Sequence, residues 1–187
     1  MTFATLLTFS RIALVPVLFI LFTLRTALPL MPWIILGVFI IAALTDYFDG
    51  VVARTYRQSS KLGRLFDPIA DKMLVIALLF MLAGYGHLDI IGLGAALIII
   101  LREILVSGMR QFVAQGGGEI EVSALAKWKT ATQMVAIGMA IVAPVFTSLL
   151  PMGALASITF AVAAILTVIT GWQYTRHTLA LLNKDAL

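Results

Sequence analysis

The chain has 187 residues, of which 61% are hydrophobic and only 12% are charged, and its mean hydropathy is +1.07. Soluble domains are about 45–50% apolar and about 25% charged, so this composition excludes a soluble globular protein and predicts an all-α integral membrane protein. Cysteine is absent, which excludes disulfides and thiolate metal sites. The net charge of +4 does not require a nucleic-acid partner, because basic residues also gather beside anionic membrane lipid, and we expect no such partner.

Six apolar segments approach the roughly 20 residues that a membrane-spanning helix needs. Together they leave little room for a soluble domain, so we expect one integral membrane domain over residues 1–187. The first segment is not followed by a small-residue cleavage pattern, and we therefore do not expect a cleaved signal peptide. In chain order, the six transmembrane helices are expected at Thr8–Leu24, Trp33–Thr55, Asp67–Leu82, Ile90–Ala114, Ser123–Val142 and Met152–Trp172.

Two of the connections have informative sequences. The stretch Tyr56–Phe66 is polar, and we expect it to form a turn between the second and third helices. Asp67 and Pro68 are typical of a helix start, because aspartate caps a helix and proline is tolerated in its first turn. The glycine-rich stretch Gly84–Asp89 predicts another turn, in which we expect His87 to be a solvated loop residue.

Basic residues are distributed very unevenly about the six expected spans. An even number of spans places both termini on the same side of the membrane, together with the second and fourth connections. Of the 13 lysines and arginines, Arg25 alone lies toward the opposite side. Because basic residues concentrate on the cytoplasmic side, both termini and the polar stretch after the second span are expected in the cytoplasm. The residues on that side are Arg11, Arg54, Arg57, Lys61, Arg64, Lys72, Arg102, Arg110, Lys127, Lys129, Arg176 and Lys184.

Four aspartates flank the polar stretch at helical spacing. Asp46 and Asp49 are three residues apart, and Asp67 and Asp71 are four apart, so each pair lies on one helix face. If the turn brings the two helix ends together, four carboxylates converge, and their mutual repulsion calls for one or two divalent cations. Hard oxygen ligands select Mg²⁺, Mn²⁺ or Ca²⁺, and a pair of such cations is the usual clamp for displacement at phosphorus.

Small and basic residues lie between these aspartates. Gly50 and Gly63 let a bulky ligand approach the backbone. The small side chain of Ala53 leaves room on the same helix face, and Arg54 can neutralise a phosphate. Helix caps and ordinary ion pairs explain one or two aspartates beside membrane spans. They explain poorly four aspartates at helical spacing with small residues between them, which favours a functional site.

The pattern D-x2-D-G-x2-A-R-x8-G-x3-D-x3-D resembles the signature of the CDP-alcohol phosphotransferases, and so does the six-span layout. This resemblance implies the fold of that family, transfer of a phosphate-containing group from a CDP-linked donor to an alcohol, and release of CMP. It also implies two divalent cations, Mg²⁺ or Mn²⁺, a homodimer, and Asp71 as the base. The implied cation ligands are Asp46, Asp49, Asp67 and Asp71, and the implied CDP-binding residues are Asp49, Gly50, Ala53, Arg54 and Gly63.

The rest of the chain resembles one branch of that family, the phosphatidylglycerophosphate synthases, which use CDP-diacylglycerol and glycerol 3-phosphate. Two positions depart from that branch, with Thr5 in place of asparagine and Ala126 in place of glycine. This resemblance implies that Thr8 and Arg11 contact a head group. The stretches that carry it are Leu7-Thr8-x-x-Arg11-Ile12, Arg102-Glu103-Ile104 with Ser107 and Arg110, Val122-Ser123, and Lys127-x-Lys129-Thr130 with Gln133-Met134.

An anionic acceptor needs cationic side chains beyond the metal site. Arg110, Lys127 and Lys129 lie on the expected cytoplasmic side of the fourth and fifth spans and can bind the acceptor's phosphate. Alternatively, they are anchors that follow from the positive-inside rule. Arg102 and Glu103 lie deeper, and they either belong to the acceptor site or simply pair with each other inside the membrane.

We therefore expect an enzyme of the cytoplasmic membrane that transfers the phosphatidyl group of CDP-diacylglycerol to the 1-hydroxyl of glycerol 3-phosphate. A CMP-forming cardiolipin synthase, or another CDP-alcohol phosphatidyltransferase, is the nearest alternative. A cation-coupled transporter is disfavoured, since transporter ion sites lie near the bilayer midplane and these aspartates fall at helix ends. A non-catalytic scaffold is disfavoured by the unbroken signature.

Overall fold

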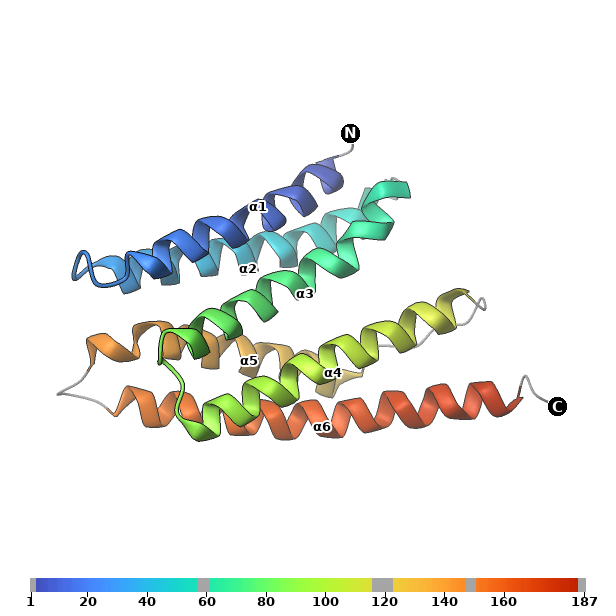
Figure 1. Cartoon of the computed structure of the whole chain (residues 1–187). Coiled ribbons are helices and arrows are strands. Elements are labelled where there is room, and N and C mark those ends of the chain that lie inside the picture. The colour runs from blue at the N-terminus through green and yellow to red at the C-terminus, as the bar shows by residue number, and fades with distance from the viewer. Residues whose placement is uncertain (1–2, 57–60, 116–122, 147–150, 185–187) are drawn as a thin grey trace. The chain divides into compact units, whose positions relative to one another are not determined.

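The computed structural model describes the backbone of residues 3–56, 61–115, 123–146 and 151–184. It describes the side chains of these ranges except at 3–8, 46–56, 61–68, 71 and 182–184. Within this part of the chain the secondary structure is helical, as the sequence predicts, and no strand occurs (Figure 1). The helices are α1 (Phe3–Thr23), α2 (Met31–Tyr56), α3 (Lys61–Gly84), α4 (Ile90–Gln115), α5 (Ala124–Val142), the short 3-10 helix η1 (Ala143–Val145) and α6 (Met152–Lys184).

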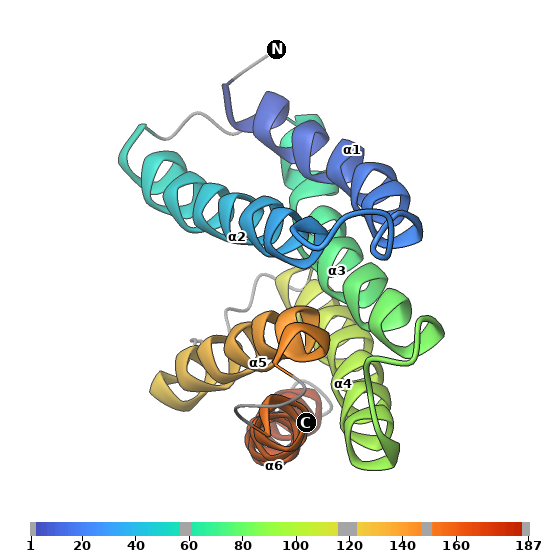
Figure 2. The same cartoon turned by 90° about the vertical axis from the view of Figure 1, so that its left-hand side faces the viewer.

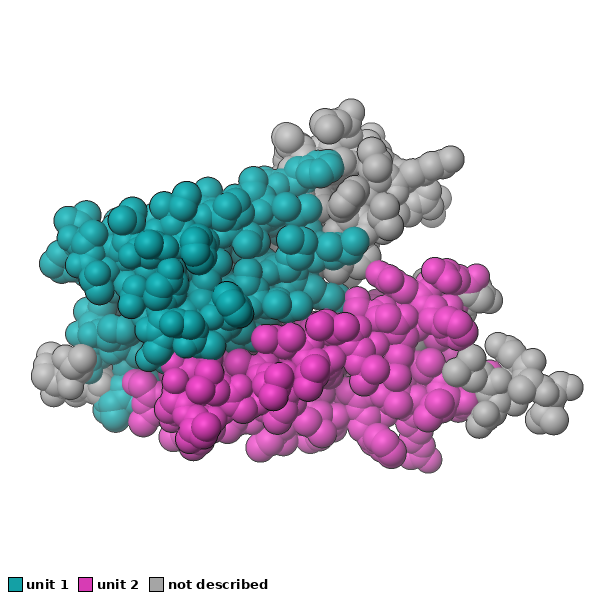
Figure 3. All heavy atoms as spheres, viewed as in Figure 1, with its two compact units in different colours: residues 1–87, 140–152 teal, residues 88–139, 153–187 magenta. Residues whose placement is uncertain are grey.

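The chain divides into two compact units, which Figure 3 colours separately. Unit 1 comprises residues 1–87 and 140–152, and therefore holds α1, α2, α3 and η1. Within it, α1 lies along α3 and α2 (Figures 1 and 2). The core of unit 1 is apolar and closely packed, because side chains from all three long helices are completely or almost completely buried in it, among them Leu18, Phe22, Ile35, Leu78 and Leu82.

Unit 2 comprises residues 88–139 and 153–187, and therefore holds α4, most of α5, and α6. Its core contains fully buried Ile99, Ile137 and Phe160, one from each helix. A buried polar residue, Thr167, lies on α6 as well. Polar side chains inside unit 2 therefore need partners from neighbouring helices, since water is excluded there.

The surface of the described residues is unusually apolar. Within the described part of the chain, Ile90–Gln115 and Met152–Leu181 are long and apolar enough to cross a membrane, and only 28% and 33% of their most apolar stretches are buried. The exposed fractions of Phe80, Ile90 and Trp172 are 72%, 82% and 68%. Soluble monomers rarely expose large continuous apolar patches. Shorter apolar stretches occur at Phe9–Thr23, Met31–Thr45 and Lys72–Gly84.

Three helix ends differ clearly from the sequence-based expectation. The first helix was expected to begin at Thr8, but α1 begins at Phe3. The expected start of the third helix at Asp67 is wrong, because α3 begins at Lys61 and contains Asp67 and Pro68 within it. Lysine, leucine and arginine in that first stretch are strong helix formers, and a single proline removes only one backbone hydrogen bond. The last helix was expected to end at Trp172, but α6 continues to Lys184, because its polar C-terminal part has no glycine or proline after residue 171 to stop it.

Side-chain caps define the N-termini of α4 and α5. The carboxylate Oδ1 of Asp89 accepts a hydrogen bond from the backbone N–H of Gly92 at 2.8 Å. Ser123 does the same for the N–H of Ala126 at 3.3 Å. Each cap satisfies one of the backbone donors that a helix start leaves without a partner, which explains why the helices begin where they do.

The turn after α3 depends on one glycine. Gly86 has a positive φ of 73°, a conformation that residues with a Cβ atom rarely adopt. The N–H of Gly86 bonds to the carbonyl of Ala83 at 3.2 Å, and the N–H of His87 bonds to the carbonyl of Leu82 at 2.9 Å. This pair of bonds is a Schellman motif, which ends the helix and fixes the direction of the chain toward α4.

His87 is not the solvated loop residue that the sequence predicts. Its Nδ1 donates to the carbonyl of Ala140 at 3.0 Å, and its ring meets Phe22 edge to face at 5.9 Å. Tyr85 stacks on the same Phe22 ring, and the guanidinium of Arg25 lies over the Tyr85 ring, 4.2 Å from its centre. The turn is therefore tied to the end of α1 and the end of α5, all within unit 1.

This environment predicts a stability that falls in acid. Burial lowers the pKa of His87 below its ordinary value of 6.5; the bond to Ala140 acts in the opposite direction, and the charge of Arg25 lowers the pKa further. The unfolded chain therefore binds a proton more readily than the folded protein as the pH falls below about 6.5. The stabilisation is fully present above that pH and is lost as the pH falls toward the lower folded-state pKa.

The measurement is the unfolding temperature of the purified protein between pH 8 and about pH 5. We expect His87→Gln to have a lower unfolding temperature than the wild type at pH 8. The difference between the two unfolding temperatures should become smaller toward pH 5. The control is His177→Gln, which changes the chain's other histidine, an exposed residue of α6. A gap for His87→Gln that stays constant across the range would contradict this assignment.

Candidate active site

The aspartate motif lies on two consecutive helices of unit 1. Asp46 and Asp49 lie in the C-terminal part of α2, and Asp67 and Asp71 lie in the N-terminal half of α3. Both pairs therefore have the helical backbone that their spacing requires for a shared face. Gly50, Ala53 and Arg54 lie on α2 beside the first pair, and Gly63 lies in the first turn of α3, ahead of the second pair.

A short link brings the ends of the two helices near each other. Only residues 57–60 separate Tyr56 from Lys61, so the Cα atoms of these two residues lie at most roughly 18 Å apart. The side chains of all four aspartates fall outside the described residues, and their convergence on a cation stays a prediction. Elsewhere, among the residues whose side chains the structure describes, no three potential metal ligands come together.

The donor set nevertheless fits the divalent cations that the sequence predicts. Four carboxylates supply hard oxygen ligands and four negative charges, which suits Mg²⁺ or Mn²⁺ and does not suit softer metals. Two helices present two carboxylates each, at spacings that place each pair on one face. The same residues without a cation would repel one another.

The two predicted head-group contacts lie on α1. The side chain of Thr8 falls outside the described residues, whereas Arg11 is buried in unit 1, with 4% of its surface exposed. A charged side chain inside an apolar helical unit is unfavourable unless it serves a purpose. Burial of Arg11 is consistent with either a structural or a ligand-binding role, so its contact with a head group stays a prediction.

The three predicted acceptor-binding cations differ in their surroundings. Arg110 on α4 and Lys127 on α5 are exposed, whereas Lys129 is buried, with its side chain 5% exposed. Two residues along a helix correspond to a rotation of about 200° about its axis. The side chains of Lys127 and Lys129 therefore lie on nearly opposite sides of α5. Of these three residues, Lys129 alone points into the interior of unit 2.

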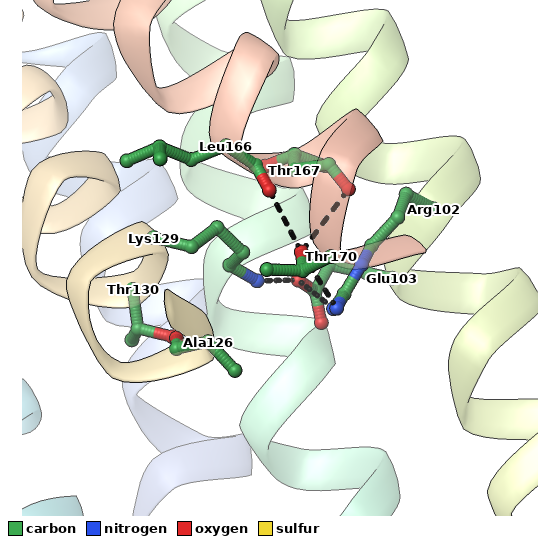
Figure 4. Close-up of polar contacts among 8 residues, drawn as sticks. All are labelled: Arg102, Glu103, Ala126, Lys129, Thr130, Leu166, Thr167 and Thr170. Carbon is green, nitrogen blue, oxygen red and sulfur yellow. Dashed lines mark hydrogen bonds and ion pairs between the residues drawn. The ribbon is translucent and has the colours of Figure 1, made fainter. Parts of the chain in front are cut away.

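Lys129 belongs to a polar network inside unit 2 (Figure 4). Its ammonium bonds to the carboxylate of Glu103, and the same oxygen, Oε1, lies 3.4 Å from Nη1 of Arg102. The pairing of Arg102 with Glu103, one of the two alternatives left by the sequence, is thus confirmed. The Nη2 of Arg102 donates to the hydroxyl of Thr170 at 3.1 Å.

The contribution of α6 to this network was missed by sequence reasoning. Thr170, Gly171 and Tyr174 all contact Arg102: the guanidinium carbon lies 5.5 Å from the centre of the Tyr174 ring, and a Cβ atom added at Gly171 would lie 3.1 Å from Cγ of Arg102. The available signal was the spacing of polar and small residues at positions 167, 170, 171 and 174 of an otherwise apolar segment, which is typical of one helix face.

The comparisons with known proteins agree with the motif. The chain belongs to the CDP-alcohol phosphatidyltransferase family, whose family profile matches residues 1–172. Because this family works on lipids and two helices are suited to crossing a bilayer, the protein is a membrane protein.

Individual relatives show which branch of the family the chain is similar to. The CDP-diacylglycerol–glycerol-3-phosphate 3-phosphatidyltransferase of Rickettsia typhi is 39% identical over 168 residues, which cover 90% of this chain and 92% of the relative. The protein of the same name from Haemophilus influenzae is 39% identical over 134 residues, or 71% of each chain. That of Salmonella choleraesuis is 40% identical over 135 residues, covering 71% of this chain and 72% of the relative.

Proposed function

We propose that this protein transfers the phosphatidyl group of CDP-diacylglycerol to the 1-hydroxyl of sn-glycerol 3-phosphate, forming phosphatidylglycerol phosphate and CMP. The observation that carries the proposal is the similarity, over nine tenths of the chain, to relatives named for this reaction. The aspartate motif supports it, because all eight positions of the signature are occupied and lie on α2 and α3.

In this proposal, the whole chain is one catalytic domain in the cytoplasmic membrane. Its six helices span the bilayer, and both termini and the motif face the cytoplasm, in keeping with the distribution of lysine and arginine. CDP-diacylglycerol enters from the membrane with its acyl chains in lipid. The active protein is a homodimer, as the resemblance implies.

The donor's diphosphate binds at the aspartate motif. Asp46, Asp49, Asp67 and Asp71 hold two divalent cations, Mg²⁺ or Mn²⁺, which when bound neutralise the diphosphate and the charge that develops on the leaving group. Arg54 adds a guanidinium that can pair with a phosphate oxygen. The remaining CDP contacts are proposed for Asp49, Gly50, Ala53 and Gly63, where small side chains allow the nucleotide close to the helix backbone.

Asp71 acts as the general base. Its carboxylate accepts the proton of the glycerol 1-hydroxyl while the oxygen attacks the phosphorus that carries diacylglycerol. The bond from that phosphorus to the bridging oxygen of the diphosphate breaks, and CMP leaves with the electron pair. Arg110, Lys127 and Lys129 are proposed to bind the phosphate of the acceptor, and Thr8 and Arg11 to contact a head group.

The test is an acceptor panel with the purified protein in detergent–lipid micelles. CDP-diacylglycerol is supplied with glycerol 3-phosphate, phosphatidylglycerol or inositol phosphate, and CMP is measured. We expect CMP to appear with glycerol 3-phosphate at a rate at least about tenfold above the other alcohols. CMP release that instead depends on phosphatidylglycerol would identify a cardiolipin synthase and contradict the proposal.

A further inference from the structure

We propose that Glu103 is a positioning residue for acceptor binding, because its carboxylate holds Lys129 in the interior of unit 2. This inference rests on the proposed function, in which Lys129 binds the phosphate of the acceptor. Glu103 itself touches neither substrate. Its role is to fix the place and the charge of a lysine that belongs to another helix.

Lys129 points in an unusual direction for a lysine of a membrane protein. A lysine on a helix beside lipid normally extends its ammonium toward the membrane surface and water. Lys129 instead points inward, where its side chain is 5% exposed, and Glu103 accepts its hydrogen bond (Figure 4). A buried ammonium is strongly unfavourable without a counter-charge, so the carboxylate is the physical reason that Lys129 can occupy this position.

Glu103 is itself held by a second cation, Arg102. Arg102 approaches the same carboxylate oxygen, Oε1, at 3.4 Å, and is fixed to α6 by its bond to Thr170 and by its position over Tyr174. Gly171 leaves room for the stem of Arg102. The carboxylate is therefore paired with an arginine that α6 holds in place, and this fixes the position at which it meets Lys129.

Two cations meet the one carboxylate of Glu103. Arg102 and Lys129 both approach its Oε1, in a place that is largely closed to solvent. An ammonium has three donors and can bond a carboxylate and a phosphate at once.

Buried polar atoms within one helical turn of this network support the proposal that an acceptor binds beside Lys129. Among the described residues, Nε of Arg102, Oε1 of Gln133 and Oγ1 of Thr167 are buried without a hydrogen-bond partner. Gln133 lies one turn after Lys129 on α5, and Thr167 lies one turn before Thr170 on α6. Buried polar atoms are almost always satisfied, and a polar ligand with hydroxyl and phosphate groups supplies both the donors and the acceptors that these atoms lack.

The test compares steady-state kinetics of the full-length protein and its variants, with each substrate varied separately. We expect Glu103→Gln to raise the KM for glycerol 3-phosphate roughly tenfold to a hundredfold, while the KM for CDP-diacylglycerol stays within about twofold. The double variant Glu103→Gln/Lys129→Gln should match Lys129→Gln alone, because Glu103 acts through Lys129. The control is Arg176→Gln, which removes an exposed charge of α6.

If Glu103→Gln does not fold, Glu103→Asp decides the question, since it keeps the charge and shortens the side chain by one methylene. A rise in the KM for glycerol 3-phosphate alone supports the proposal. Unchanged KM values, equal losses for both substrates, or additive effects in the double variant would overturn it. A wild-type protein that releases no CMP with any alcohol phosphate would contradict the proposed function itself, which is a separate result.

Discussion

Replacing Asp71 with asparagine is expected to slow CMP release by roughly a hundredfold to ten-thousandfold, the range that general bases contribute. Asparagine has the same shape as aspartate and remains compatible with the interior of α3, where residue 71 lies. It cannot accept the proton of the glycerol hydroxyl. The measurement is the single-turnover rate of CMP formation at saturating concentrations of both substrates.

A matched control is available in Asp89→Asn. This variant makes the same chemical change at a helix start, where Asp89 accepts a bond from the N–H of Gly92, and asparagine caps a helix about as well as aspartate. We expect Asp89→Asn to keep wild-type activity, and Asp71→Asn to keep at least the wild-type unfolding temperature in a chelator, where the loss of a cation ligand has no effect. Near-normal CMP release by a folded Asp71→Asn protein would show that another group is the base.

Removal of divalent cations is expected to abolish turnover, and addition of Mg²⁺ or Mn²⁺ to restore it. The four aspartates lie on two helices that a link of four residues joins. A cation bound between them therefore stabilises the folded state as well as the reaction. At a concentration about 100 times its dissociation constant, such a ligand adds about 2.7 kcal/mol to the free energy of unfolding.

Heat stability provides a readout that does not depend on catalysis. Mg²⁺ should raise the unfolding temperature of the wild-type protein, and Asp67→Asn should require a higher Mg²⁺ concentration for the same increase. Asp89→Asn, which lies outside the motif, should respond to Mg²⁺ as the wild type does. Full activity in a chelator, with no effect of Mg²⁺ on the unfolding temperature, would rule out the proposed cation site.

The sequence predicted the helices well because their signal is local. Each long apolar stretch became a helix. The turn predicted at Gly84–Asp89 contains a Schellman motif, and the helix start predicted at Ser123 has a side-chain cap. The two largest errors concern polar ends. At Lys61–Phe66 and after Trp172, polarity was interpreted as the absence of a helix, although these residues favour helix formation and have one polar face available.

The sequence predicts only those parts of the candidate site whose chemistry is visible in residue type and spacing. The aspartate motif was visible because its members are three, four and eighteen residues apart along the sequence. The bond from Lys129 to Glu103 joins residues 26 positions apart, and it depends on how α5 is rotated against α4. Likewise, His87 meets Ala140 across 53 positions, and no local pattern indicates such a contact.

Transfer of label from glycerol 3-phosphate into lipid tests the central claim most directly. The purified protein is placed in vesicles that contain CDP-diacylglycerol, and radiolabelled glycerol 3-phosphate and Mg²⁺ are added. We expect the label to enter the lipid phase as phosphatidylglycerol phosphate, with one CMP released per labelled lipid. CMP formation without label in the lipid, or label in the lipid without CMP, would contradict the account.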